Sequence, residues 1–340
     1  MATLKQLAMA KRMINASICA YQVYATGWLP ERDPPPVLRT VDNTNGRDYY
    51  DVLAVYQDAV GFLDTAAHYT PLFVSSGDDS INAALVGATR DGLLVIALRG
   101  TLPPKFDHDD TQAWIMDWAQ DGEIQPKGWT LGTGATARTF QVEGGFADAV
   151  DSLAPSLKLL IDQTLATAHC SGVVVTGHSK GGALTFLTAA WVEVTYPQFR
   201  GKIEVHAFAA PPVADAAFAA YYAASPLANM THRYQVENDI VPFLPLWKGA
   251  DIFAAVKFDD FGRRIFWSGL GLVVATETNG GYVVVGDFTY FDHTHHIVEG
   301  AVVTHTALPA VAATYSLGTE AAVQLVIDAH SSYASYLPCF

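Results

Sequence analysis

The sequence predicts an α/β fold in which helices cover both faces of a mostly parallel central sheet. Three observations support this prediction. Short apolar runs rich in β-branched residues alternate with longer segments whose apolar residues recur at helical spacing. The short runs are apolar throughout, as expected for strands that are buried on both faces. Half of the 340 residues are hydrophobic and only 16% are charged, so the chain can bury a large core.

The elements follow one another in a regular order. The N-terminal segment is expected to form an amphipathic helix, because Lys5, Lys11 and Arg12 interrupt its apolar residues. Residues 30–47 form a polar, proline-rich excursion within the domain. The core elements then expected are strands at 92–98, 172–176, 203–209 and 231–237, and helices at 145–166, 183–191 and 216–224. Strand–helix alternation of this kind indicates a parallel sheet.

The pattern changes after residue 265. Two apolar runs, 272–276 and 282–285, flank the sequence TNGG, which is typical of a hairpin turn. We therefore expect a β extension at about 265–300, followed by an apolar C-terminal helix from about Glu320. Because no repeat or linker divides the sequence, we predict a single domain over residues 1–340.

Charge and composition exclude several classes of function. The formal net charge of −14 repels nucleic-acid phosphates, so nucleic acid is not an expected partner. No apolar segment reaches the ~18 residues that a membrane span needs, and no signal peptide is recognisable, so no integral membrane segment is expected. The compartment stays open, with the cytoplasm as the default. Three scattered cysteines are too few for a disulfide framework.

A serine lies in a tight corner between a predicted strand and a predicted helix, in GVVVTGHSKGGALTF (172–186). Gly177 and Gly181 stand two positions before and two after Ser179, which lets the strand and the helix approach closely. This G-x-S-x-G spacing is typical of a nucleophile elbow, which raises the serine hydroxyl above the sheet beside a helix N-terminus. The simpler alternative is a glycine-rich turn with an N-capping serine.

A nucleophilic serine needs a base and an acid that orients the base. In elbow enzymes the order along the chain is serine, acid, histidine. Asp239 follows the predicted strand 231–237, at the sheet edge where open α/β sheets place their sites. The alternative is that Asn238 and Asp239 only form a turn before Pro242. The histidines that follow Asp239 are His293, His295, His296, His305 and His330.

With these motifs in order, the chain resembles the class 3 lipases, the fungal-lipase-like branch of the α/β-hydrolases. Five segments carry the resemblance: the oxyanion strand IALRGT (96–101), the Trp-containing segment AWIMDW (113–118), VEGGF (142–146), AFAAP (207–211) and VENDIVPFLP (236–245). The chain departs from the family pattern in three places. Lys180 replaces leucine, Glu143 replaces histidine, and residues 102–111 lengthen the lid region.

The resemblance implies roles for five residues. Ser179 would be the nucleophile and Asp239 the acid, while Thr101 and the backbone N–H of Lys180 would form the oxyanion hole. His330 is the expected base, because AHSSY (329–333) resembles the family's C-terminal His-x-x-Tyr arrangement. The interval of 91 residues between Asp239 and His330 is longer than usual. The earlier histidines His293, His295 and His296 therefore stay open as alternatives.

The resemblance also implies a lid at about residues 102–130. Trp114, Ile115 and Trp118 would share one helical face. We expect this face to close over an apolar cleft and to meet lipid when the lid opens. A helix buried permanently in the core would show the same pattern.

The expected function is that of a serine carboxylic-ester hydrolase, in the first instance a lipase for triacylglycerol or long-chain esters at a lipid–water interface. A short-chain esterase or a phospholipase A1 fits the same residues, and no cofactor or metal is expected. Two alternatives lie outside this class: a non-catalytic protein that binds an apolar ligand, and a metallo-hydrolase that uses residues 292–296 (DHTHH), although this cluster lacks a second ligand set. Residues 107–110 (DHDD) are expected to form a charged loop rather than a calcium site.

Overall fold

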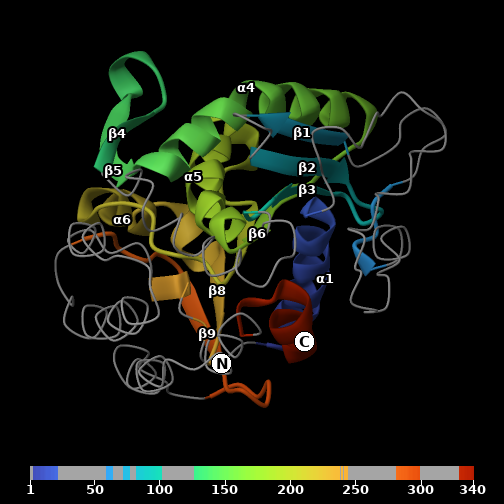
Figure 1. Cartoon of the computed structure of the whole chain (residues 1–340). Coiled ribbons are helices and arrows are strands. Elements are labelled where there is room, and N and C mark those ends of the chain that lie inside the picture. The colour runs from blue at the N-terminus through green and yellow to red at the C-terminus, as the bar shows by residue number, and fades with distance from the viewer. Residues whose placement is uncertain are drawn as a thin grey trace.

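In a computed structural model of the protein (Figure 1), the described residues are 3–21, 59–63, 72–76, 82–101, 126–237, 239, 241–243, 281–298 and 329–340. Their strands are β1 (Leu72–Ser76), β2 (Asn82–Ala88), β3 (Leu93–Leu98), β4 (Pro126–Leu131), β5 (Arg138–Glu143), β6 (Gly172–His178), β7 (Ile203–Phe208), β8 (Thr231–Val236) and β9 (Asp287–Phe291). Their α-helices are α1 (Leu4–Ala20), α4 (Gly144–Thr167), α5 (Lys180–Thr195) and α6 (Ala216–Ala223).

The centre of the molecule is a seven-stranded sheet in the order β1-β2-β3-β6-β7-β8-β9, and β4 and β5 form a separate two-stranded sheet. In this main sheet, β1 pairs with β2 and β2 with β3 in antiparallel fashion. The remaining neighbours in the order β3-β6-β7-β8-β9 are all parallel. The predicted fold class is therefore confirmed. The carboxyl ends of β3, β6, β7 and β8 meet at one edge of this sheet, which is where ligand sites form in such folds.

The two faces of the sheet bury two separate cores. Alternate residues of the central strands point to opposite faces. Ile96 of β3 and Val175 of β6 pack into the core beneath α4, α5 and α6. Val95 and Val174 pack instead into the core beneath α1. Burying such a side chain stabilises the fold by about 1.5–3 kcal/mol, which explains why these strands are apolar on both faces.

The first helix is fixed to the sheet by polar contacts as well as by packing. The Arg12 guanidinium donates two hydrogen bonds of 2.7 Å to Asp91, and its Nε donates to the carbonyl oxygen of Val60. Ser17 Oγ lies 3.0 Å from Thr176 Oγ1 in β6. These contacts hold the end of α1, and with it Tyr21, near the carboxyl end of β6.

The region after residue 265 differs from the expected extension. Asp287–Phe291 forms β9, a strand of the main sheet that pairs parallel with β8, and Val283 makes an isolated bridge to Ala214. The predicted run 272–276 lies outside the described residues. The C-terminal helix is described only at its end, where Ala329 and His330 lead into the π-helical turn η7 (Ser332–Tyr336). No described helix has the length and apolar character of a membrane span.

Candidate active site

Ser179 occupies a strained corner between β6 and α5. Its backbone has φ 61° and ψ −131°, a conformation that costs a non-glycine residue about 1–3 kcal/mol. A Cβ atom on Gly177 would collide with the carbonyl oxygen of Gly181, and one on Gly181 would collide with that of Leu98. The two glycines therefore allow β3, β6 and α5 to meet directly beneath the serine. Ser179 makes no side-chain cap, so the N-cap alternative does not describe this hydroxyl.

The structure brings Ser179, His330 and Asp239 together. His330 Nε2 lies 2.9 Å from Ser179 Oγ, and His330 Nδ1 lies 3.1 Å from both carboxylate oxygens of Asp239. Asp239 Oδ1 also accepts a hydrogen bond from the backbone N–H of Val241. All three side chains are buried. The carboxylate selects the tautomer with a proton on Nδ1, which leaves Nε2 free to accept the serine proton.

The three earlier histidines that are described lie in a separate, exposed loop. His293 Nδ1 is 2.8 Å from Glu237 Oε2, and His296 Nδ1 is 2.8 Å from Thr294 Oγ1. His295 is half-buried at a positive φ, and His305 lies outside the described residues. Within the described part of the chain, no group of three His, Cys, Asp or Glu side chains is arranged to hold a metal ion. Residues 107–110 are not described.

Tyr336 was not predicted as a site residue. Its hydroxyl donates a 2.5 Å hydrogen bond to Asp239 Oδ2 and accepts one from the backbone N–H of Val236. Burial and the charge of Asp239 raise its pKa far above the ordinary value of 10, so the hydroxyl keeps its proton and acts as a donor. The His-x-x-Tyr resemblance pointed to Tyr333, but the tyrosine that contacts Asp239 stands six residues after His330.

His178 and Tyr21 form a second polar layer beneath His330. The His178 ring lies 4.7 Å from the His330 ring and 5.3 Å from that of Tyr336, and its Nδ1 is 2.9 Å from the Tyr21 hydroxyl. Burial, and then the neighbouring charge of His330, lower the pKa of His178 well below 6.5. His178 therefore stays neutral and supports His330 without competing for its proton. No sequence motif pointed to Tyr21, which is the C-cap residue of α1.

The two residues expected to form the oxyanion hole flank the serine. Lys180 is the first residue of α5, so its backbone N–H belongs to the helix N-terminus beside Ser179. Thr101 follows the end of β3, where Leu98 pairs with Gly177 of β6. Position 100 requires glycine, because a Cβ atom there would collide with the Tyr21 hydroxyl and the carbonyl oxygen of His178. The roles of Thr101 and Lys180 stay predictions.

The expected lid lies largely outside the described residues, including Trp114, Ile115 and Trp118. The last part of the region assigned to the lid is a strand, because 126–131 is β4 and pairs with β5. Trp129 in β4 is buried, and its Nε1 donates to Asp151 of α4. Glu143 now has a role that the sequence did not reveal: it is the N-cap of α4, and its carboxylate accepts a hydrogen bond from the Phe146 N–H at 2.7 Å.

Comparison with known proteins agrees with this geometry. Residues 95–249 match the family model of the class 3 lipases, a stretch that contains the elbow and the acid. This part of the chain is similar to the class 3 lipases. The match also includes Thr101 and the whole of the region between β3 and β5. His330 lies beyond the matched residues, and the structure places it beside Ser179 and Asp239.

Solved structures share the fold of this chain. A mutant form of MDLA from Penicillium cyclopium has a TM-score of 0.55 at 16% identity, covering 99% of this chain and 98% of that one. A triacylglycerol lipase described as having a serine-protease triad has a TM-score of 0.54 at 19% identity, with coverages of 85% and 82%. A deletion mutant of the Rhizomucor miehei lipase propeptide complex has a TM-score of 0.54 at 18% identity, with coverages of 93% and 78%. At these identities the likeness establishes the fold.

Proposed function

We propose that the protein is a lipase-type serine ester hydrolase that works through an acyl-enzyme on Ser179. One observation carries the proposal: His330 lies within hydrogen-bond distance of Ser179 Oγ on one side and of Asp239 on the other. A binding protein for apolar ligands needs no such relay and no strained serine. The match of residues 95–249 to the family model of the class 3 lipases supports the same activity.

In this mechanism Ser179 Oγ attacks the ester carbonyl carbon while His330 Nε2 takes its proton. Asp239 holds the imidazole in position and stabilises the imidazolium that forms. The backbone N–H of Lys180, together with Thr101, receives the negative charge that develops on the carbonyl oxygen, and one such donor contributes about 3 to 4 kcal/mol. His330 then protonates the leaving alcohol, and water deprotonated by the same imidazole releases the acid from Ser179.

The proposed substrate is an ester with a long acyl chain, such as a triacylglycerol, met at a lipid–water interface. The class 3 lipase resemblance and the likeness to a structure described as a triacylglycerol lipase support this choice. A preference for short chains would instead identify an esterase, and release of one acyl chain from a phospholipid would identify a phospholipase A1.

The decisive experiment measures the hydrolysis of p-nitrophenyl esters from acetate to palmitate. We expect rates to rise with chain length, and we expect Ser179→Ala to lower kcat by about 10⁴-fold or more, as for other nucleophile losses. His330→Ala should have a similar effect, whereas the matched control His295→Ala should keep most of the activity. Full activity of the Ser179→Ala variant would refute the assignment of the nucleophile.

A further inference from the structure

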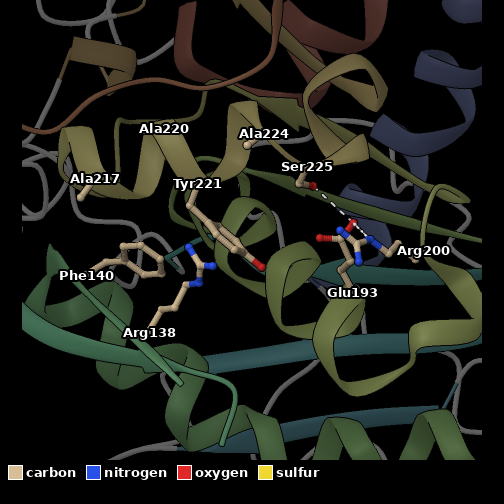
Figure 2. Close-up of a pocket in the computed structure, with 9 residues that line it drawn as sticks. All are labelled: Arg138, Phe140, Glu193, Arg200, Ala217, Ala220, Tyr221, Ala224 and Ser225. Carbon is tan, nitrogen blue, oxygen red and sulfur yellow. Dashed lines mark hydrogen bonds and ion pairs between the residues drawn. The ribbon is translucent and has the colours of Figure 1, made fainter. Parts of the chain in front are cut away.

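A pocket of about 570 Å³ opens at the far end of α5 from the candidate active site (Figure 2). It lies between β5, the last turn of α5 and α6. Ser179 immediately precedes α5, whereas the pocket residue Glu193 lies in its last turn. At a rise of 1.5 Å per residue, the helix separates the two by roughly 20 Å. The pocket is therefore a site of its own.

Three charged side chains line this pocket. Glu193 is the buried one: its side chain is 5% exposed, and Ser225 Oγ donates to it at 3.3 Å. Arg200 Nε lies 4.0 Å from the same carboxylate oxygen, but its side chain is 67% exposed and extends toward solvent. Arg138 places its guanidinium 5.5 Å from the centre of the Tyr221 ring and pairs with no acid among the described residues.

The sum of these charges is positive in a strongly negative protein. Two arginines against one glutamate leave one uncompensated positive charge, on a chain whose net charge is −14. The Glu193 carboxylate lies 4.0 Å from Arg200 Nε, so it offsets one of the two guanidinium charges. Arg138 is exposed, rests on the Tyr221 ring and has no acid partner in the part of the chain that the structure describes, so its N–H groups can donate to a ligand.

Tyr221 lies between the two arginines (Figure 2). Burial and the charge of Glu193 raise the pKa of its hydroxyl, while Arg138 and Arg200 act in the opposite direction, so all three charged groups lie close enough to influence it. The hydroxyl is therefore a protonated hydrogen-bond donor in the same space as both guanidinium groups. The apolar wall consists of Phe140, of Ala217 and Ala220 in α6, and of Ala224 at the C-cap of that helix.

We infer that this pocket binds a small organic carboxylate whose apolar body rests on Phe140 and α6. Arg138, Arg200 and the Tyr221 hydroxyl are the donors for its two oxygens. A monoanion matches the single uncompensated charge, and a planar carboxylate suits the fork of a guanidinium. Inorganic phosphate has no apolar part that could cover the apolar wall, so it fits the pocket less well. A cation would be repelled by the two arginines.

The test is isothermal titration calorimetry of the full chain with sodium benzoate, using inorganic phosphate and choline chloride as comparison ligands. We expect saturable benzoate binding that Arg138→Gln weakens at least tenfold and that Ala220→Phe, which fills the pocket, abolishes. Arg90→Gln is the matched control, because Arg90 is an exposed arginine outside the pocket, in the turn between β2 and β3.

Three results would overturn the inference. Wild-type protein that shows no saturable benzoate binding has no such site. Binding that is equal in the wild type and in Arg138→Gln places the ligand elsewhere, including in the catalytic cleft. If choline binds more tightly than benzoate, the pocket prefers a cation, and Glu193 is then the group that recognises the ligand. Hydrolysis of p-nitrophenyl butyrate by Arg138→Gln at the wild-type rate shows that the variant is folded, so failure here is distinct from failure of the proposed activity.

Discussion

Asp239 is held by more than its histidine. Besides His330, it accepts hydrogen bonds from the backbone N–H of Val241 and from the Tyr336 hydroxyl. A carboxylate with these donors has a fixed orientation and a stabilised negative charge. Because that orientation in turn fixes the imidazole, Tyr336 is a positioning residue for the proposed base.

Tyr336→Phe tests this role by removing only the hydroxyl. We expect kcat for p-nitrophenyl esters to fall about tenfold, equivalent to about 1.4 kcal/mol, because the imidazole loses part of its alignment, while KM stays unchanged. Tyr196→Phe is the matched control, since its hydroxyl bonds Asp162 near the opposite end of α5. If both variants lose activity equally, or if only KM changes, the positioning role is wrong.

His178 makes folding stability depend on pH. Its pKa in the folded protein lies well below 6.5, so below pH 6.5 the unfolded chain binds a proton that the folded chain does not. The contribution is therefore fully present above pH 6.5 and falls as the pH drops. His178→Asn should reduce the slope of unfolding free energy against pH by up to about 1.4 kcal/mol per unit between pH 6 and 4.5.

Urea titrations across this pH range measure that slope. The matched control is His169→Asn, which replaces an exposed histidine after α4. We expect the control to keep the wild-type slope. An unchanged slope in His178→Asn would show that His178 takes up a proton as readily in the folded protein as in the unfolded chain.

At the scale of elements, the sequence predicts those strands and helices that are apolar on both faces or at helical spacing. β3, β6, β7, β8, α1, α4, α5 and α6 all lie within a few residues of their expected positions. β2 (NAALVGA) is rich in small residues, and β4 begins with proline and contains Gly128, so neither has the composition of a typical strand. They form strands because neighbouring strands pair with them.

The candidate site likewise contains some residues that the sequence reveals and others that it does not. Ser179 and Asp239 lie in local motifs beside strand ends, so their types and spacing are visible in the sequence. The sequence left four candidates for the proposed base, because the separation along the chain does not determine which imidazole lies beside Asp239. These candidates were His293, His295, His296 and His330. Tyr21, His178 and Tyr336 belong to no shared motif and come together only through the packing of α1 and the C-terminal turn.

The attachment of α1 can be tested through Asp91. Hydrogen bonds from Arg12 hold the pKa of Asp91 below 3.8 in the folded protein. The ionised pair is therefore stabilising above about pH 4, and this contribution is lost as the pH falls through the folded-state pKa. Because Asp91 is half-exposed and screened by solvent, Asp91→Asn should lower the unfolding free energy at pH 7 by less than about 1 kcal/mol.

Thermal and urea unfolding at pH 7 and pH 3 measure this difference. The difference in unfolding free energy between the wild type and Asp91→Asn should be smaller at pH 3 than at pH 7. Asp148→Asn, which removes an exposed partner of Lys127 at a distance from α1, is the control for a general charge effect. A gap that widens at pH 3 would contradict the linkage.

At the scale of the whole molecule, the net charge of −14 acts on any interface that becomes anionic. The proposed reaction releases fatty acid anions, which would make the surface of an emulsion droplet negative and repel the protein. We expect hydrolysis of a neutral triacylglycerol emulsion to slow with time at low ionic strength. Addition of 0.1 M NaCl, where the Debye length is about 10 Å, should restore the rate.

A soluble short-chain ester provides the control for this prediction, because it presents no charged surface and its hydrolysis should not respond to salt. Emulsion hydrolysis that is equally fast at all ionic strengths would show that the overall charge does not limit adsorption.

The C-terminal turn packs beside α1 and completes the relay from the end of the chain (Figure 1). A ribosome that has just added Asp239 has made the proposed nucleophile and acid, but it must add 91 more residues to supply the imidazole of His330. A nascent polypeptide that has grown only as far as Asp239 therefore lacks the proposed base and cannot carry out the proposed reaction.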